Sequence, residues 1–379
     1  MKVQRQRVSF NRLWRAMSHI GWASRRYKTC EWKVVAHLLN VYRMTGCRPF
    51  EAHRDGLSDP ATPAERLAGT IAKAGLLALQ LRLNPSSHRV LAMDKAVFYL
   101  LCEGLGLPVP RLYGVIDPDR RNLRGEVLGT RVSVHALLQR VDGDIIVKPA
   151  RGVYGHGISA YSRTPMGFLD RRSGEMLTVD SLASSLGANR TDRVIVQERL
   201  RNHPDLTDLS GSETLQTVRI RCLVTSTGDV RMGGSFLKLA VGDQVVDNID
   251  GGRTGNFLAA VRLETGRLCT PVAYSTGGLG VDAVDRHPRT GRFLPQFEVP
   301  LWTEAKALAK SASLAFLPLR TIGWDIGLTP EGPVLVEGNP YWDPANLMAA
   351  APTDGCYAEE MVALLTLLRR EAGGKHAGV

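Results

Sequence analysis

Two acidic side chains and an amide near the C-terminal end of the chain have the types and spacing of a cation site. Asp325 and Glu337 each stand alone in an apolar run, GWDIGL and VLVE, and Asn339 follows two residues after Glu337. A carboxylate in an apolar strand is costly unless it is compensated, and a divalent cation is a common compensation. Oxygen ligands favour Mg²⁺ over zinc. The alternative is a surface hairpin with two solvated acids.

The turn sequence Thr-Pro-Glu-Gly between the two runs predicts a β-hairpin. A four-residue loop over 329–332 would place the acids on different faces. A five-residue loop over 329–333, or a bulge, would set Asp325 opposite Glu337. We therefore predict the longer loop or a bulge. Asn339 then shares the face of Glu337, because side chains alternate with a period of two.

A second group of residues could bind phosphate. The β-run IIVK ends at Lys148 and opens into a loop that contains Gly152, Gly155, His156 and Gly157. Backbone amides of such a loop can approach phosphate closely, and the lysine adds positive charge. Neither the Walker nor the Rossmann glycine pattern occurs. A plain glycine-rich hairpin is the alternative.

Two shorter signals complete the series. Another buried run, VIVQERL, ends in Gln197, Glu198, Arg199 and Leu200, and Lys95 follows Asp94 at a predicted helix start. Taken alone, an acidic residue at a helix start is ordinary. The order is more informative than any one signal: helix-start lysine, strand–lysine–glycine loop, strand–glutamate, then the Asp–Glu–Asn hairpin.

That order resembles the ATP-grasp superfamily. Within it, residues 88–365 are most similar to the sugar-transfer-associated ATP-grasp family, which is related to α-L-glutamate ligases and more distantly to D-alanine:D-alanine ligases. The segments that carry the resemblance are VQERLRNHPDL, TVRIRC, VDNIDGGRTGNF and WDIGLTPEGPVLVEGNP. It implies an α+β fold in which two α+β subdomains clamp ATP, here with an N-terminal basic helical extension.

The resemblance also implies roles for residues. Lys95 and Lys148 would contact the ATP phosphates, the loop 152–157 would close over them, and main chain at 198–200 would recognise adenine. Mg²⁺ would be held by Asp325, Glu337 and Asn339, and the candidate catalytic groups are Arg219, Arg221 and Arg253. One position departs from D-alanine:D-alanine ligases, where an arginine precedes the metal-binding aspartate by two residues. Gly323 stands there, so we expect Arg219 or Arg253 to supply that charge.

The implied reaction is that of an ATP-dependent carboxylate–amine ligase acting through an acyl phosphate, in surface polysaccharide or glycoconjugate biosynthesis. A kinase that phosphorylates a hydroxyl of a sugar or other small molecule would use the same phosphate clamp. A nucleotide-dependent, non-catalytic scaffold is the third interpretation. The sequence leaves the donor, the acceptor and the oligomeric state open.

Four segments are expected along the 379 residues. These are a basic helical region at 1–84, a first ATP-grasp subdomain at 85–198, a second at 199–370 and a disordered tail at 371–379. In the first segment, Trp32, Val35, Ala36, Leu39 and Tyr42–Arg43 recur at helical spacing. A helix over about 63–79 is expected to begin with a capping signal, Thr62-Pro63-Ala64-Glu65.

The net charge of +11 is concentrated at one end, because residues 1–54 contain twelve Lys and Arg against Glu31 and Glu51. Such asymmetry suggests a polyanionic partner, an anionic membrane surface rather than nucleic acid, and a solvated extension is the alternative. No apolar run is long enough for a membrane span or a secretory signal. The six cysteines form no CxxC pair, so we expect free thiols, no disulfide framework and a cytoplasmic location.

Overall fold

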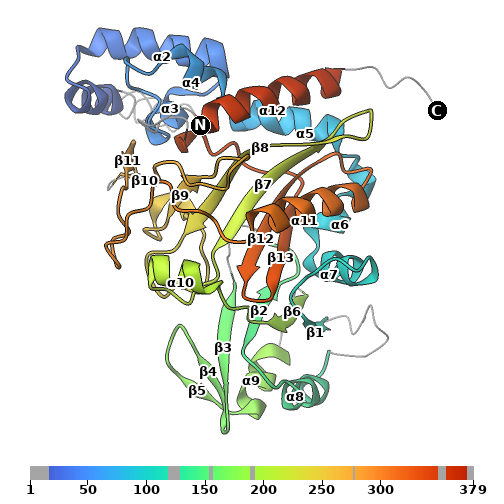
Figure 1. Ribbon diagram of the computed structural model, residues 1–379. Coiled ribbons are helices and arrows are strands. Elements are labelled where there is room, and N and C mark those ends of the chain that lie inside the picture. The colour runs from blue at the N-terminus through green and yellow to red at the C-terminus, as the bar shows by residue number, and fades with distance from the viewer. Residues whose placement is uncertain are drawn as a thin grey trace, which may run out of the picture.

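Two antiparallel sheets form the framework of the protein (Figure 1). The computed structural model describes residues 17–117, 129–152, 157–187, 193–275, 278–348 and 356–373. In Figure 1 the first sheet lies in the lower half, the second sheet crosses the upper half, and the N-terminal helices lie at the top. None of the described helices is long and apolar enough to cross a lipid bilayer.

The first sheet has six strands in the order β1-β6-β2-β3-β4-β5. Their bounds are β1 Leu112–Ile116, β2 Ile145–Pro149, β3 Ser159–Thr164, β4 Gly167–Asp170, β5 Met176–Leu177 and β6 Val194–Glu198. Two helices, α8 Arg131–Gln139 and α9 Val179–Gly187, pack against it around buried Phe168 and Val196. Helix α8 begins at Arg131, because Thr130 Oγ1 caps it by accepting from the Ser133 amide.

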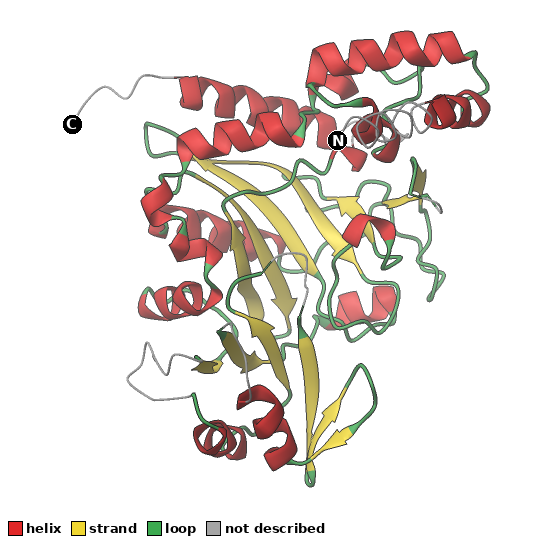
Figure 2. Ribbon diagram, turned by 180° about the vertical axis from the view of Figure 1, so that it is seen from behind, coloured by secondary structure: helices red, strands yellow, loops and turns green. Residues whose placement is uncertain are grey.

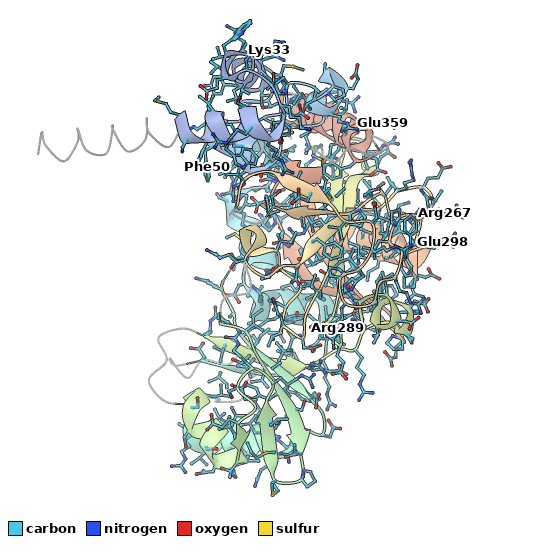
Figure 3. All side chains as sticks on the ribbon, turned by 90° about the vertical axis from the view of Figure 1, so that its left-hand side faces the viewer. Lys33, Phe50, Arg267, Arg289, Glu298 and Glu359 are labelled. Carbon is cyan, nitrogen blue, oxygen red and sulfur yellow. The ribbon has the colours of Figure 1, made fainter. Side chains whose placement is uncertain are left out.

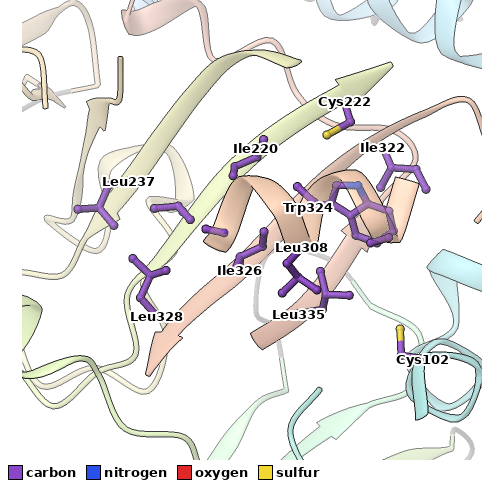
Figure 4. Close-up of a cluster of buried hydrophobic side chains, with 14 of the residues drawn as sticks. Cys102, Ile220, Cys222, Leu237, Leu308, Ile322, Trp324, Ile326, Leu328 and Leu335 are labelled. Atoms are coloured by element: carbon purple, nitrogen blue, oxygen red, sulfur yellow. The ribbon is translucent and has the colours of Figure 1, made fainter. Parts of the chain in front are cut away.

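The second sheet has seven strands in the order β11-β10-β9-β8-β7-β12-β13. Their bounds are β7 Thr217–Val224, β8 Val230–Leu239, β9 Phe257–Ala260, β10 Val272–Tyr274, β11 Val281–Ala283, β12 Thr321–Thr329 and β13 Gly332–Asn339. Every second residue of β12 enters the main core, as Figure 4 shows for Ile322, Trp324, Ile326 and Leu328. Because side chains alternate along a strand, Asp325 lies on the opposite face.

Helices cover both faces of this second sheet. The core containing Trp324 also includes α7 Lys95–Gly104 and α11 Trp302–Ala315. The other face carries α5 Lys73–Leu83 and α12 Cys356–Gly373, which lie across the upper end of the sheet in Figure 2. Two short helices, α6 Val90–Met93 and α10 Pro204–Ser210, complete this half. Helix α12 continues three residues into the expected tail, and residues 374–379 lie outside the described part of the chain.

The N-terminal region is helical, as expected, but its helices break differently. Residues 17–26 are helical and are followed by α2 Glu31–Thr45, α3 Pro49–Arg54 and α4 Ala64–Ala68. The single helix expected over 63–79 is wrong: α4 and α5 are separate, and a Cβ at Gly69 would lie 2.6 Å from the Ala358 carbonyl oxygen of α12. The expected Thr62 cap is also absent, because Pro63 occupies the N-cap position and has no side chain that can accept a hydrogen bond.

Helix α2 confirms the helix that the spacing of apolar residues predicts for this segment. The buried side chains are Val34, Leu38, Val41 and Thr45. The apolar stripe that predicted the helix, Trp32, Val35, Leu39 and Tyr42, is exposed instead.

The cysteines differ from expectation at one position. Cys47, Cys102 and Cys222 are buried free thiols and Cys30 is an exposed one. Cys269, however, is disulfide-bonded, which overturns the expectation of free thiols throughout. Spacing along the chain cannot reveal such a bond, because the fold can bring together cysteines that are distant in sequence.

Candidate functional site

The hairpin β12–β13 has the register that a shared cation requires. Asp325 lies directly opposite Glu337, and Gly323 lies opposite Asn339. The turn is short, with Thr329 paired to Gly332, so the longer loop is absent. A one-residue irregularity next to Asp325 restores the register. The predicted bulge is therefore confirmed.

Asp325 lies within a group of buried charges. Its carboxylate accepts two hydrogen bonds from Arg219, at 2.6 and 2.5 Å, and one from Lys238 Nζ at 3.0 Å. Burial alone would raise the pKa of Asp325, but the charges of Arg219 and Lys238 outweigh it and hold that pKa well below its usual range. Lys238 also lies 3.7 Å from Asp247, whose carboxylate accepts from both the amide and the hydroxyl of Thr217. The Asp325 carboxylate is therefore ionised and held in position.

Lys238 was missed by the sequence reasoning. It stands alone in the apolar run SFLKLAV, which is the pattern that marked Lys148. Both lysines are less than 10% exposed. The rule that identified Lys148, a single charge in an apolar strand, would therefore have identified Lys238 on β8 as well.

The two lysines predicted to bind phosphate, Lys95 and Lys148, lie beside Glu337 of the hairpin. Lys95 Nζ lies 3.0 Å from Glu337 Oε1 and 3.1 Å from the Gly152 carbonyl oxygen. Lys148 Nζ donates to the Tyr99 hydroxyl at 2.9 Å. Burial, with the nearby charge of Lys95, lowers the pKa of Lys148 to about 7. An arriving anion would favour the charged form of this amine.

Helix α7 begins where the sequence predicts, and Asp94 has the ordinary capping role. Its Oδ1 accepts from the amides of Ala96 and Val97. Its Oδ2 accepts from Arg151 at 3.0 Å and Arg193 at 2.7 Å. This cap fixes the helix end from which Lys95 reaches the site.

Three adjoining cavities connect these residues. The central cavity, of about 100 Å³, brings together Lys95, Lys148, Lys238, Asp325 and Glu337. The hinge cavity, of about 120 Å³, shares Lys148 and Thr217 with it and is lined by the predicted adenine-binding residues Gln197, Glu198, Arg199 and Leu200. The outer cavity, of about 360 Å³, shares Gly152 and Glu337 with the central cavity and is lined by Asn339, Arg151 and Tyr341.

Some predicted residues lie elsewhere. Arg221 is fully buried, donates to the carbonyl oxygens of Gly234 and Asp343, and lies over the rings of Phe236 and Trp342, so its place is structural. Arg253 is exposed and pairs with Asp250. The structure therefore favours Arg219 over Arg253 as the source of the charge next to Asp325.

The glycine loop is only partly described. Gly152 lines the central cavity, and Gly157 has φ of 74°, a conformation that favours glycine. Gly155 and His156 lie outside the described residues. Their predicted role in closing over phosphate stays a prediction.

The packing of Trp342 explains why position 323 is a glycine. A Cβ at this position would lie 2.9 Å from the Trp342 Cβ, which is tighter than real Cβ contacts. The arginine found here in D-alanine:D-alanine ligases would therefore collide with Trp342. Arg219, on the neighbouring strand β7, is paired in register with Asp325 and places a positive charge beside it.

A family model described as "Sugar-transfer associated ATP-grasp" matches residues 77–353. The chain belongs to this family. The two sheets are accordingly the paired α+β subdomains of an ATP-grasp fold, as the sequence predicts. No curated protein matches the sequence.

Several solved structures share general features with this ATP-grasp chain. They include a biotin carboxylase–β,γ-ATP complex from Campylobacter jejuni (10% identity, TM-score 0.42, 78% of this chain and 50% of that one). A D-alanine–D-alanine ligase from Helicobacter pylori has 12% identity and a TM-score of 0.40, and the match covers 74% of this chain and 61% of that one. An ADP complex of N5-carboxyaminoimidazole ribonucleotide synthetase has 12% identity and a TM-score of 0.40, and the match covers 73% of this chain and 53% of that one. This chain thus spans about half to three-fifths of their lengths.

The side chains present fit a magnesium–nucleotide complex. Lys95, Lys148 and Lys238 line the central cavity with Asp247, Asp325 and Glu337, and Arg219 pairs with Asp325, so an anion that enters the cavity meets three lysine side chains. Gln197 Oε1, in the hinge cavity, is buried without a hydrogen-bond partner. Within the described ranges no three His, Cys, Asp or Glu side chains form a metal cluster. A carboxylate pair that leaves other positions to phosphate and water is typical of Mg²⁺ rather than zinc.

Proposed function

We propose that this ATP-grasp protein is an ATP-dependent, ADP-forming carboxylate–amine ligase. The observation that supports it best is the central cavity, where three lysines face an opposed carboxylate pair next to the hinge cavity. Phosphoryl transfer requires mainly in-line positioning and charge neutralisation on the phosphates. The buried cations in this cavity are held in place by hydrogen bonds before any ligand arrives.

The residues divide the work by position. Lys95 and Lys148 would hold the phosphates, main chain at Glu198–Leu200 would bind adenine, and Arg219 would neutralise charge on the transferred group. Asp325, Glu337 and Asn339 would hold Mg²⁺, which supplies further charge neutralisation when bound. Asn339 lines the outer cavity rather than the central one, so Glu337 is the ligand common to both.

The proposed reaction has two steps. A carboxylate oxygen of the donor attacks the γ-phosphorus, and ADP leaves with the electrons of the broken P–O bond. An amine then attacks the acyl phosphate carbon, loses a proton, and inorganic phosphate leaves. Exclusion of water protects the acyl phosphate in between. The family's description favours substrates from surface polysaccharide or glycoconjugate assembly.

Product analysis tests this proposal. The protein is incubated with Mg-ATP, amino acids and uronic-acid or peptide partners, and the products are identified by mass. ADP formed together with an amide is the expected result. A phosphorylated hydroxyl compound without condensation would replace the ligase by the kinase, and no ATP-dependent product at all, with Glu337→Gln functional in cells, would favour the scaffold.

We further propose a peripheral location at the cytoplasmic face of an anionic membrane. The supporting observation is the charge of residues 1–54, twelve Lys and Arg against two acids. Such a segment is attracted to anionic lipid within a Debye length. Vesicle binding that weakens strongly at about 0.5 M salt is expected. Equal binding at low and high salt would remove this argument.

A further inference from the structure

The outer face of helix α2 is apolar, whereas a surface helix is usually polar on its solvent side. Trp32 is 70% exposed, Leu39 53% and Tyr42 55%. The opposite face of the helix is already buried, through Val34, Leu38 and Val41. Helix α2 is therefore apolar on both sides, and the core uses only one of them.

Cationic side chains border this apolar face. Lys28 and Lys33 lie near the start of α2, and Arg43 and Arg48 near its end, all exposed. In Figure 3 Lys33 lies at the extremity of the molecule, and Phe50 on α3 is a further exposed apolar side chain of the N-terminal helices. The acids of the segment that bear on this face are Glu31 and Glu51, and Glu51 accepts from the Arg48 amide at 2.8 Å. The face thus combines exposed apolar side chains with a positively charged border.

We propose that this face of α2, formed by Trp32, Val35, Leu39 and Tyr42, docks on an anionic bilayer by inserting into the headgroup–acyl boundary. The proposal rests on the peripheral location proposed above, not on the reaction. Trp and Tyr favour the membrane interface, and long basic side chains can reach lipid phosphates from a partly inserted helix. A second copy of the chain would cover the apolar stripe, but its own cationic border would oppose that contact. Charge complementarity therefore selects anionic lipid.

The position of α2 in the fold suits this role. It contacts α3 and α4, and it lies at the end of the molecule opposite the β3–β5 hairpins (Figure 1). With 15 residues it is too short to cross a bilayer and would lie in the interface. Docking there leaves the three cavities clear of the lipid surface.

Sedimentation of the full chain with vesicles tests the proposal. Binding is expected to vesicles of equal parts phosphatidylcholine and phosphatidylglycerol, and not to phosphatidylcholine alone. The double variant Trp32→Ser/Leu39→Ser is expected to bind the anionic vesicles at least about tenfold more weakly, because burying one large apolar side chain is worth that factor. The matched control is Val132→Ser/Met166→Ser, two side chains 79% and 74% exposed in the first-sheet subdomain, which should bind like the wild type.

Each other outcome has a separate meaning. If the Trp32/Leu39 variant keeps its thermal unfolding midpoint and binds as tightly as the wild type, docking is by charge alone and the insertion is wrong. If the wild type binds neither vesicle, the peripheral location fails as well. If the wild type is a dimer in solution that the double variant converts to a monomer, a second copy covers the face and the proposal is overturned. ATP turnover in the same preparations reports separately on the ligase proposal.

Discussion

The central cavity and helix α2 reverse the usual distribution of polarity in opposite ways. In the cavity, charged side chains such as Asp325, Lys148 and Lys238 are buried; on α2, Trp32 and Leu39 are exposed. The buried charges compensate one another through short hydrogen bonds, so the cavity is stable before a ligand arrives. The apolar face of α2 has no covering group among the described residues. The charges of the cavity are thus paired within the chain, whereas the apolar face of α2 is open among the described residues and is the face that we propose docks on lipid.

The largest effect should come from removing the buried carboxylate. Asp325→Ala leaves Arg219 and Lys238 buried without their shared counter-charge, and we expect it to lower the free energy of unfolding by about 3–5 kcal/mol. Urea denaturation measures it. The matched control is Glu298→Ala in the exposed pair with Arg267, which should leave stability nearly unchanged. If Asp325→Ala were as stable as the control variant, the buried charges of the cavity would not depend on one another for stability, and the contrast with the surface pair would be lost.

Glu337→Gln separates function from stability within the same cavity. The Glu337 side chain is 29% exposed, and Gln keeps an oxygen that can accept from Lys95, so unfolding should change less than in Asp325→Ala. Loss of a metal-binding carboxylate should lower ATP turnover at least about 100-fold, because mutating residues that only support the metal ligands already lowers metal affinity or activity about 10- to 100-fold. Steady-state ADP release measures it, with Glu331→Gln in the β12–β13 turn as the control. Wild-type turnover in Glu337→Gln would remove the metal assignment.

Gly323→Arg tests whether the missing arginine can be restored. The clash with Trp342 should cost about 1–3 kcal/mol of unfolding free energy, the range for overpacking, with no gain in turnover. Thermal or urea unfolding checks this. Gly242→Ala, where an added Cβ meets nothing within 4 Å, is the control. A stable, more active Gly323→Arg variant would show that Arg219 does not replace the arginine.

The smallest expected effect concerns Lys148 and pH. Because its pKa is about 7, free protein loses this charge as pH rises through neutrality. Bound phosphate favours the charged form and raises that pKa, so ATP binding takes up a proton above pH 7 and weakens about tenfold per pH unit until the bound-state pKa is reached. Calorimetry in buffers of different ionisation enthalpy measures the uptake. Lys148→Arg should bind with little pH dependence over the same range, and an unchanged dependence would place the titration elsewhere.

The sequence predicted the cavity well because lone charges in apolar strands are visible without a fold. Asp325, Glu337 and Lys148 were found in this way, and the bulge followed from requiring both acids on one face. Arg221 has the same strand pattern as Arg219, yet aromatic rings surround it, and only the tertiary packing of Trp342 and Phe236 reveals that.

Helix α2 was predicted as a helix but not in its orientation. Periodicity gives the apolar stripe of Trp32 and Leu39, but it does not tell which stripe of a doubly apolar helix faces the core. The break between α4 and α5 depends on the backbone of α12 at Ala358, some 290 residues away along the chain. Contacts of that range have no local signal.

The hydroxyl of Tyr99 has a consequence for the connection between the two sheets. It accepts from Lys148 Nζ at 2.9 Å and donates to the Val336 carbonyl oxygen at 2.7 Å, in the bulged part of β13 beside Glu337. Lys148 of the first sheet is therefore linked through one side-chain oxygen to the β13 backbone beside Glu337 of the second sheet, so the two sheets share a hydrogen-bonded connection next to the central cavity.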